Sequence, residues 1–307
     1  MKYTFGPVNS RRFGLSLGID LSPVSKSCNF DCLYCELKAA KPIDKIKNPP
    51  QIKDIINEVK KVLTDKPNIE VITITSNGEP TLYENLDKLV DELNLIKKDK
   101  KLLILSNAST IADPKIQEIL KKIDIVKLSL DCVSQKCFEK IDRPLEGIKI
   151  ADIVDGIKTF AKDFKSDLII EILVVKNVND KKVEMQMLNI VLQDINPSRI
   201  DLGTIDRPPA FDVLPVSSET LKDLSEYFKG LAISIIHKDK PKVRVTFSQD
   251  EILETIKRRP QSQSDVDYLF SDISKKYLVR LLDEKKVVKR VIAGVDFYSE
   301  TKRILSK

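Results

Sequence analysis

Short apolar runs alternate with amphipathic helical patterns up to residue 229, and this alternation limits the fold more than any other feature of the chain. Six runs rich in Ile, Val and Leu are typical of strands buried on both faces. They cover residues 13–21, 71–76, 102–106, 125–130, 168–175 and 199–203. Helical patterns cover residues 52–63, 86–96, 114–122, 151–164, 183–195 and 218–229. This order predicts a parallel α/β sheet, which right-handed crossovers would curl into a closed or partial barrel.

The pattern changes after Pro241, where three helical stretches precede two β-like runs. The helical stretches cover 250–259, 262–270 and 272–284, and the β-like runs cover 286–292 and 295–299. Ala293-Gly294 between the two runs is a hairpin signal. Three helices followed by a hairpin is the order of a winged helix-turn-helix. A chain of 307 residues suits one large and one small domain, which we place at 1–240 and 241–307.

Composition is that of a soluble globular protein, with 42% hydrophobic and 32% charged residues. Every apolar run is shorter than the roughly 18–20 residues that span a bilayer, and the N-terminus has no apolar signal region. Five cysteines are an odd number and do not indicate a disulfide framework. We therefore expect a cytoplasmic protein with no membrane partner.

Three of the five cysteines crowd into one short segment, at Cys28, Cys32 and Cys35. Thiolates at spacings of four and three can converge on one metal centre, and thiolate ligation suits iron–sulfur clusters. Three protein ligands leave one iron of a cubane open to bind and activate a substrate. A structural zinc site is the alternative. Zinc would need a fourth ligand, and the single histidine, His237, is remote in sequence.

Polar residues follow the second and third predicted strands. Gly78 gives backbone freedom at a turn, and the carboxylate of Glu79 could hold an ammonium group. Asn107 could donate a hydrogen bond to a ribose or a carboxylate. Ligands of parallel sheets bind at the carboxyl ends of the strands, so these are candidate binding residues. The alternatives are a turn that ends the strand and a cap for the next helix.

Later strand ends add further candidates. Alternation puts Ser129 and Asp131 on one face of the fourth strand, and that face could be the barrel lumen. The alternative is a buried polar pair satisfied by the backbone. Lys176 after the fifth strand could neutralise a carboxylate or could simply be solvated. Arg207 after the sixth strand suits a carboxylate or phosphate on a substrate, or it pins its own loop.

The three cysteines, with the aromatic Tyr34 just before the last, resemble the signature of the radical S-adenosylmethionine (SAM) superfamily. The resemblance implies a partial (β/α)6 barrel, a 4Fe–4S cluster and SAM, whose cleavage yields a 5′-deoxyadenosyl radical that abstracts hydrogen from a substrate. It also implies an electron donor such as a flavodoxin or ferredoxin, and it places Tyr34 at the cofactor. Gly78-Glu79 resembles the family's motif for the SAM amino group, and Ser129 and Asp131 stand where the family contacts SAM or substrate.

Four further segments narrow the resemblance to a bacterial subgroup related to the wyosine tRNA-modifying synthases. These segments are residues 6–14, 78–81, 142–144 and 206–209. The archaeal wyosine synthases are expected to carry additional cysteines ahead of the cluster motif for a second cluster, whereas no cysteine precedes Cys28 here. We therefore expect no second cluster. We expect Cys132 and Cys137 to fill space as small hydrophobic side chains.

The predicted winged helix carries basic residues that could contact nucleic-acid phosphates. They are Lys275, Lys276, Arg280, Lys285, Lys286, Lys289 and Arg290. Docking of a protein partner, or solvation alone, is the alternative. The leading hypothesis is a radical enzyme of oxidoreductase or lyase type that acts on an unidentified substrate, with RNA as one option. The rival hypothesis is a non-enzymatic Fe–S or zinc regulator that reads nucleic acid.

Overall fold

The main sheet contains eight strands that lie side by side in the order in which they occur along the chain. The structure is a computed structural model that describes residues 2–10, 12–235, 244–258, 260–292 and 295–301. The strands are β1 (Thr4–Ser10), β2 (Gly14–Asp20), β3 (Val71–Thr75), β4 (Lys101–Ser106), β5 (Ile125–Ser129), β6 (Asp167–Val174), β7 (Arg199–Thr204) and β8 (Ile233–Ile235). Strands β2 to β8 pair in parallel, and β1 pairs antiparallel with β2. The predicted α/β class with a mostly parallel sheet is confirmed.

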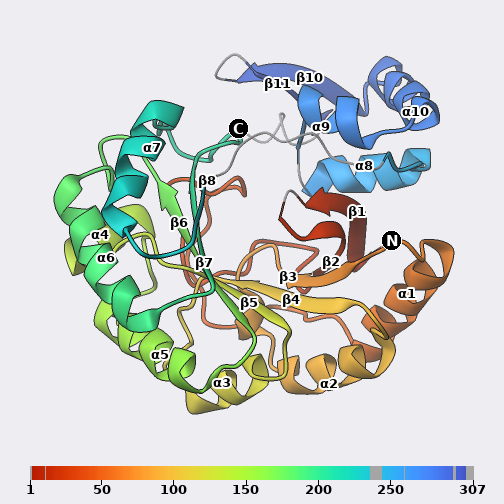
Figure 1. The fold of residues 1–307 in the computed structure, drawn as a ribbon. Coiled ribbons are helices and arrows are strands. Elements are labelled where there is room, and N and C mark those ends of the chain that lie inside the picture. The colour runs from red at the N-terminus through yellow and green to blue at the C-terminus, as the bar shows by residue number, and fades with distance from the viewer. Residues whose placement is uncertain (1, 11, 236–243, 259, 293–294, 302–307) are drawn as a thin grey trace.

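Helices cover the outer face of this curved sheet, as Figure 1 shows. They are α1 (Ile52–Asp65), α2 (Leu86–Ile96), α3 (Pro114–Leu120), α4 (Gln135–Ile141), α5 (Ile150–Asp163), α6 (Lys182–Ile195) and α7 (Ser218–Ser225). Two short 3-10 helices, η1 (Pro80–Leu82) and η2 (Glu226–Phe228), follow β3 and α7. Because each connection crosses on the outer face, the carboxyl ends of the parallel strands meet at one edge.

Local signals explain where several helices begin and end. The Asp113 side chain accepts a hydrogen bond from the backbone of Lys115, and Pro114 occupies the first position of α3. The Ser134 side chain caps α4 in the same way by accepting from the backbone of Cys137. Helix α6 ends at Asn196, which adopts the left-handed conformation that commonly closes helices.

The six predicted strands are present to within one residue at each end, and each of the six predicted helices is present. Sequence analysis missed β1, β8 and α4. Strand β1 contains Gly6-Pro7, which interrupts an apolar run and predicts a turn. Strand β8 has 3 residues and α4 has 7, so neither is long enough for its periodicity to be recognised.

The two faces of the sheet are packed differently. On the outer face, side chains such as Ile72 and Ile74 are fully buried in the main hydrophobic core. On the inner face, a separate cluster of four aliphatic side chains packs with Phe13; the four are Val71, Leu103, Ile125 and Ile169. This inner cluster lies at the amino ends of β3 to β6. The apolar filling of the inner face is therefore concentrated away from the carboxyl ends.

A C-terminal unit of residues 244–301 has its own hydrophobic core, built around Phe247, Phe270 and Tyr298. Its elements are α8 (Gln249–Arg258), β9 (Gln261–Ser262), α9 (Gln263–Leu269), α10 (Asp272–Asp283), β10 (Val287–Ile292) and β11 (Val295–Glu300). The strands form a sheet in the order β10-β11-β9. The predicted hairpin turn, Ala293-Gly294, and the predicted domain boundary at 240/241 lie outside the described residues.

The C-terminal unit packs on the amino-terminal edge of the main sheet, where α8 contacts β1. Lys66 at the end of α1 forms an ion pair with Glu251, with 2.5 Å between Nζ and Oε1. The Lys66 ammonium also lies 5.3 Å from the centre of the Phe247 ring. None of the helices in the described part of the chain has the length and hydrophobicity needed to cross a membrane.

The close approach of α5 to the segment before α3 gives a test of the packing. A Cβ atom on Gly156 would lie 2.8 Å from the backbone nitrogen of Ala112, so a larger side chain must push two backbone segments apart. We expect Gly156→Val to lower the free energy of unfolding by about 1–3 kcal/mol, the usual effect of overpacking. Urea unfolding measures it, with Ala151→Val on the exposed face of α5 as control. Equal losses in both variants would contradict the packing.

Candidate active site

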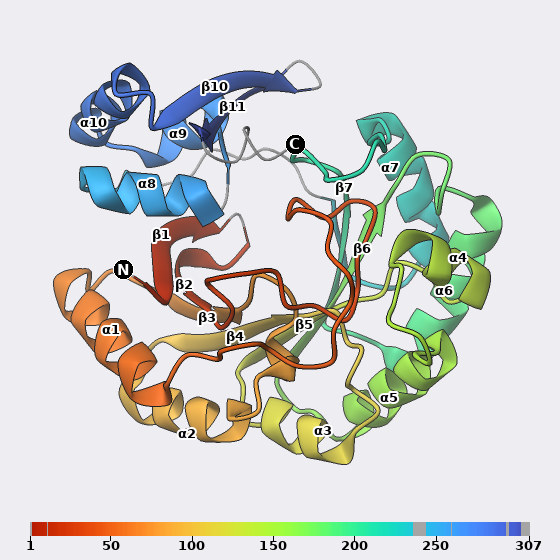
Figure 2. The same cartoon turned by 180° about the vertical axis from the view of Figure 1, so that it is seen from behind.

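The three clustered cysteines lie on the segment between β2 and α1, residues 21–51, which we call the cysteine loop. Cys28, Cys32 and Cys35 are all free thiols and all are partly exposed. Figure 2 shows the start of this loop crossing the mouth of the curved sheet from β3 toward β6. At its far side the carbonyl of Cys35 accepts a hydrogen bond of 2.8 Å from Ala210 N, which follows β7. The loop therefore spans the carboxyl ends of the strands.

The cysteine loop is attached to the sheet by backbone pairing at Gly78. Ser27 N donates to Asn77 O at 2.8 Å, and Glu79 N donates to Ser27 O at 2.9 Å. Gly78 has φ of +146°, and a Cβ atom there would lie 1.8 Å from Ser27 O. Only glycine permits this approach, so Gly78 brings the end of β3 against the residue before Cys28.

The surroundings of the thiols suit ligation of a metal cluster. Phe30 N donates to Cys28 Sγ at 3.4 Å, and Asn107 Nδ2 lies 3.6 Å from the same sulfur. Such donors stabilise sulfur ligands and tune cluster potential. Burial raises the pKa of Cys28 to about 12 and also raises the pKa of Cys35. A bound metal must therefore displace the thiol protons. His237, the remote residue of the zinc alternative, lies outside the described residues.

Glu79 is buried and orders the ends of two strands. Its carboxylate accepts hydrogen bonds from Thr81 N, Thr81 Oγ1, Ser106 Oγ and Asn107 N, at distances between 2.6 and 3.0 Å. Burial raises the pKa of Glu79. These bonds hold the carboxylate at the ends of β3 and β4 and position Asn107. That Glu79 holds an ammonium group of a ligand stays a prediction. Nearby, the buried Ser76 Oγ has no hydrogen-bond partner among the described residues, which suits a bound ligand at this edge.

Asp131 joins the end of β5 to the cysteine loop. Its Oδ2 accepts a hydrogen bond of 2.6 Å from Tyr34 Oη, and its Oδ1 accepts one of 2.7 Å from Leu173 N. The side chain is buried, and burial raises the pKa of Asp131 to about 7. Ser129 lies on β5, where its Cα pairs with that of Glu171. Tyr34, Ser129 and Asp131, predicted as cofactor-binding residues, therefore gather at the end of β5.

An ionic network on the inner face was missed by sequence analysis. Lys127 Nζ lies 2.5 Å from Glu171 Oε1 and 3.2 Å from Asp201 Oδ2. Arg12 reaches the same Asp201 oxygen at 2.5 Å, and Arg199 Nε reaches the other at 2.8 Å. Burial raises the pKa of Asp201, but the three cations outweigh burial and lower it overall. The detectable signal was a charged residue at an interior position of each of three mainly apolar strands: Lys127 in β5, Glu171 in β6 and Asp201 in β7.

The inner face is open to solvent at this level. Leu105 on the central strand β4 is 36% exposed, and the Glu171 side chain is 32% exposed. Both values are high for interior strands of a parallel sheet covered by helices. Glu171 is therefore the network member most accessible to a ligand held beneath the cysteine loop.

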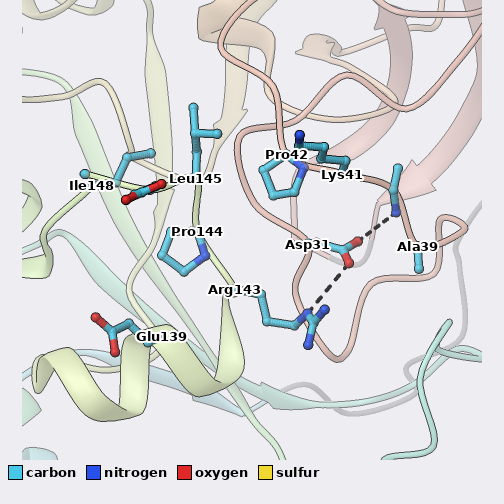
Figure 3. A pocket seen from close by; sticks show the side chains of 12 residues that line it. Asp31, Ala39, Lys41, Pro42, Glu139, Arg143, Pro144, Leu145 and Ile148 are labelled. Atoms are coloured by element: carbon cyan, nitrogen blue, oxygen red, sulfur yellow. Dashed lines mark hydrogen bonds and ion pairs between the residues drawn. The ribbon is translucent and has the colours of Figure 1, made fainter.

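A second opening flanks the outer side of the cysteine loop. It is a cavity of about 830 Å³ between residues 39–42 and 143–148. Figure 3 shows Asp31 at its wall, accepting a hydrogen bond from Ala40 N at 3.1 Å and facing the Arg143 guanidinium at 3.7 Å. The wall carries both charge signs, with Lys41 and Arg143 as well as Glu139 and Asp31, and the Arg143 side chain points toward Asp31 (Figure 3).

Two predicted ligand-binding residues lie elsewhere. Lys176 is exposed just after β6, where its backbone nitrogen donates to Leu214 O. That its ammonium neutralises a carboxylate of the cofactor stays a prediction. Arg207 donates to the carbonyl of Pro260 and lies 3.6 Å from both Glu36 and Asp265. Arg207 therefore connects the β7 loop, the cysteine loop and the C-terminal unit. These contacts agree with the alternative that Arg207 holds its own loop, and the expectation that it faces substrate stays a prediction.

Cys132 and Cys137 require a correction. The structure joins them in a disulfide across the start of α4, with 5.8 Å between their Cα atoms. Both side chains are buried. The sequence interpretation of two separate space-filling side chains is wrong, because the tight connection between β5 and α4 brings the two sulfur atoms together.

The raised pKa of Asp131 predicts a pH-dependent stability. In the folded chain the pKa of Asp131 is about 7. In the unfolded chain the pKa of an aspartate is about 3.9, as in model peptides. The free energy of unfolding of the metal-free protein should therefore fall as pH rises between these limits. Asp131→Asn removes this titratable group, so the free energy of unfolding should decrease less steeply with pH. The contribution removed is on the order of 1.4 kcal/mol for each unit by which the pKa of Asp131 is raised.

Denaturant unfolding at a series of pH values measures the two slopes. Glu79, whose pKa burial also raises, is present in both proteins and does not account for the difference. The pKa of Asp142 is raised by burial and in part by the charge of Asp131, so the difference between the slopes reports these two neighbouring carboxyl groups together. Parallel slopes for wild type and Asp131→Asn would show that Asp131 is ionised throughout.

Comparison with known proteins agrees with this geometry. The model of the Radical SAM superfamily matches residues 22–187. A UPF0026 protein of Helicobacter pylori (strain ATCC 700392 / 26695) is 39% identical over 297 residues, which cover 96% of each chain.

Two solved structures share the fold. Streptococcus suis SuiB bound to S-adenosylmethionine has a TM-score of 0.55 at 18% identity, covering 74% of this chain and 52% of that chain. A radical SAM methyltransferase from Sphaerobacter thermophilus has a TM-score of 0.57 at 13% identity, covering 72% and 65%. The family model and the Helicobacter relative establish that this chain belongs to the radical SAM superfamily and, within it, to the UPF0026 proteins.

Proposed function

We propose that this protein uses a 4Fe–4S cluster and SAM to form a 5′-deoxyadenosyl radical that abstracts hydrogen from a substrate on the inner face of the sheet. Enzymes of this superfamily use both cofactors, which supply reductive cleavage of SAM when bound. The observation that carries the proposal is the loop with three free thiols, fixed across strand ends that present polar side chains.

The protein's own residues have distinct tasks in this proposal. Cys28, Cys32 and Cys35 would hold three irons and leave the fourth for SAM. Asn107, positioned by Glu79, donates toward Cys28, and the hydrogen bond from Tyr34 to Asp131 fixes the loop over β5.

The inner face beneath the loop would receive the substrate. Glu171, restrained by Lys127 and partly exposed, can accept hydrogen bonds from a polar group. The inner cluster around Phe13 closes the amino end of the strands. A substrate held between these layers would be shielded from water, which limits side reactions of a radical.

We further propose that the enzyme is of oxidoreductase or lyase type and belongs to the subgroup related to the wyosine synthases. We also propose that a flavodoxin or ferredoxin donates its electrons. The motifs at residues 6–14, 78–81, 142–144 and 206–209 support the subgroup. An acidic flavodoxin or ferredoxin is supported by four exposed lysines that follow Cys35. These are Lys38, Lys41, Lys45 and Lys47.

Anaerobic reconstitution tests the enzyme. Cluster-loaded protein with dithionite and SAM should release 5′-deoxyadenosine. Gly78→Ala should lower both the iron content of the cluster and the amount of product about tenfold or more, because the added Cβ atom would clash with Ser27 O. A clash that costs about 1.4 kcal/mol is enough to lower the population of the native loop tenfold. Gly230→Ala is the matched control, since Gly230 also has positive φ but a Cβ there meets nothing within 4 Å.

The rival regulator predicts a different outcome. A fully loaded wild-type protein that binds nucleic acid but makes no 5′-deoxyadenosine would favour the regulator. A Gly78→Ala variant with full iron and full activity would show that the backbone pairing at Ser27 does not hold the loop.

RNA is the substrate class that we propose for the enzyme, with the C-terminal unit as a winged helix that contacts phosphates. Exposed cations on α10 and around β10 support this. Lys276 and Lys285 are exposed, whereas Lys286 and Lys289 form ion pairs of 2.8 and 2.7 Å with Glu284 and Asp296. Phosphate contacts should therefore depend mainly on the first pair of lysines.

Salt dependence of RNA binding by the full chain tests this proposal. Each lost phosphate contact should reduce the slope of log K against log salt by about 0.7 for single-stranded RNA. We expect this loss for Lys276→Ala and for Lys285→Ala, and a smaller one for Lys286→Ala and Lys289→Ala. Binding that is insensitive to salt, or equal losses in all four variants, would contradict it.

A further inference from the structure

A second group of potential metal ligands lies on the outer face of the sheet. Cys132 follows β5, Cys137 lies in the first turn of α4, and Glu184 lies in the first turn of α6. One ligand atom from each residue lies within 4.8 Å of the other two. Cys132 and Cys137 are buried, and none of the three cysteines of the loop belongs to this group. This group is therefore separate from the cysteine loop.

The Glu184 carboxylate is only half satisfied. Its Oε1 accepts a hydrogen bond of 2.9 Å from Ser134 Oγ. Its Oε2 is buried and has no hydrogen-bond partner among the described residues. A buried carboxylate oxygen without a partner is costly. A cation bound between this oxygen and the two sulfur atoms would remove that cost.

We propose that Cys132, Cys137 and Glu184 form a zinc-binding site when the disulfide is reduced. A small dithiol reduces the Cys132–Cys137 disulfide by supplying two electrons and two protons. The S–S bond breaks to give two thiols, and the dithiol is oxidised to a cyclic disulfide. Zinc then forms two Zn–S bonds and releases the two thiol protons to solvent. Two thiolates and one carboxylate suit zinc, and a water would complete the tetrahedron.

The charge of the site is consistent with its position. Zinc with two thiolates and one carboxylate carries one net negative charge. Helix α6 has 14 residues and presents the positive end of its dipole at Glu184. The disulfide and the zinc complex are thus two states of one site. In both states Cys132, which follows β5, is linked to Cys137 at the start of α4. In the disulfide state the segment between them is joined to Glu184 of α6 by the hydrogen bond from Ser134, and the zinc complex would also join the two sulfur atoms to Glu184.

The position of the site relates it to the cysteine loop without making it part of that loop. Cys132 and Cys137 lie on the segment from Asp131 to Asp142, and the acids at both ends of this segment contact the cysteine loop. Asp131 accepts from Tyr34, and Asp142 accepts from Cys32 Sγ at 3.3 Å. The inference stands independently of the proposed function, because zinc binding does not require cleavage of SAM.

Metal content of cluster-loaded protein tests the site. The protein is reduced with dithiothreitol, freed of it anaerobically, exposed to Zn²⁺ and desalted; iron and zinc are then counted by elemental analysis. We expect a full cluster and one zinc ion per chain in the wild type. Glu184→Gln should weaken zinc binding by about 100-fold or more, since even residues behind the ligands contribute 10–100-fold. Cys132→Ser should abolish it.

Two controls separate this site from the cysteine loop. Glu139→Gln, an exposed glutamate on α4, should bind zinc like the wild type. Replacement of Cys28, Cys32 and Cys35 by alanine should leave the single zinc in place, and Co²⁺ in this variant should show thiolate-to-cobalt charge transfer. Should this variant fail to fold, the joint iron and zinc count of the wild type decides.

Three results would overturn the proposal. They are a disulfide that dithiothreitol does not open, reduced wild type that takes up no zinc, and zinc binding that is unchanged in Glu184→Gln and Cys132→Ser. Loss of 5′-deoxyadenosine formation with normal zinc binding would count against the proposed function alone.

Discussion

The backbone contact between Ser27 and Gly78 is the interaction on which the rest of the site depends. It places a loop with no regular secondary structure against the end of β3, at a distance that any side chain would prevent. Further contacts then fix the remainder of the loop: Asn107 near Cys28, Asp131 at Tyr34 and Ala210 at Cys35. Each comes from the end of a different strand, so the sheet determines where the three thiols lie.

The inner face shows how a parallel sheet can carry charge. Lys127, Glu171 and Asp201 stand at interior positions of their strands, where an isolated charge would be prohibitive. They are tolerated because they neutralise one another and because Arg12 reaches in from the β1–β2 connection. The network gives the inner face a polar surface beside the apolar cluster around Phe13.

Much of the fold was predictable because the strands of a parallel sheet are apolar on both faces and their helices have clear periodicity. The thiol motif was predictable because its spacing is specific. Side-chain partners were not: Glu79 and Arg207 were correctly placed at strand ends, but their hydrogen bonds come from residues distant in sequence. The pairing of Cys132 with Cys137 depends on a tight connection that no periodic pattern marks.

Arg207 gives the molecule a mechanical link between its two parts. The same guanidinium contacts Pro260 and Asp265 in the C-terminal unit and lies near Glu36, the residue after the third thiol. A macromolecule that tilted the C-terminal unit on docking would pull this guanidinium and strain the rim of the thiol loop. In the proposed function, an RNA docked on the C-terminal unit would thereby act on the loop that would hold the cluster.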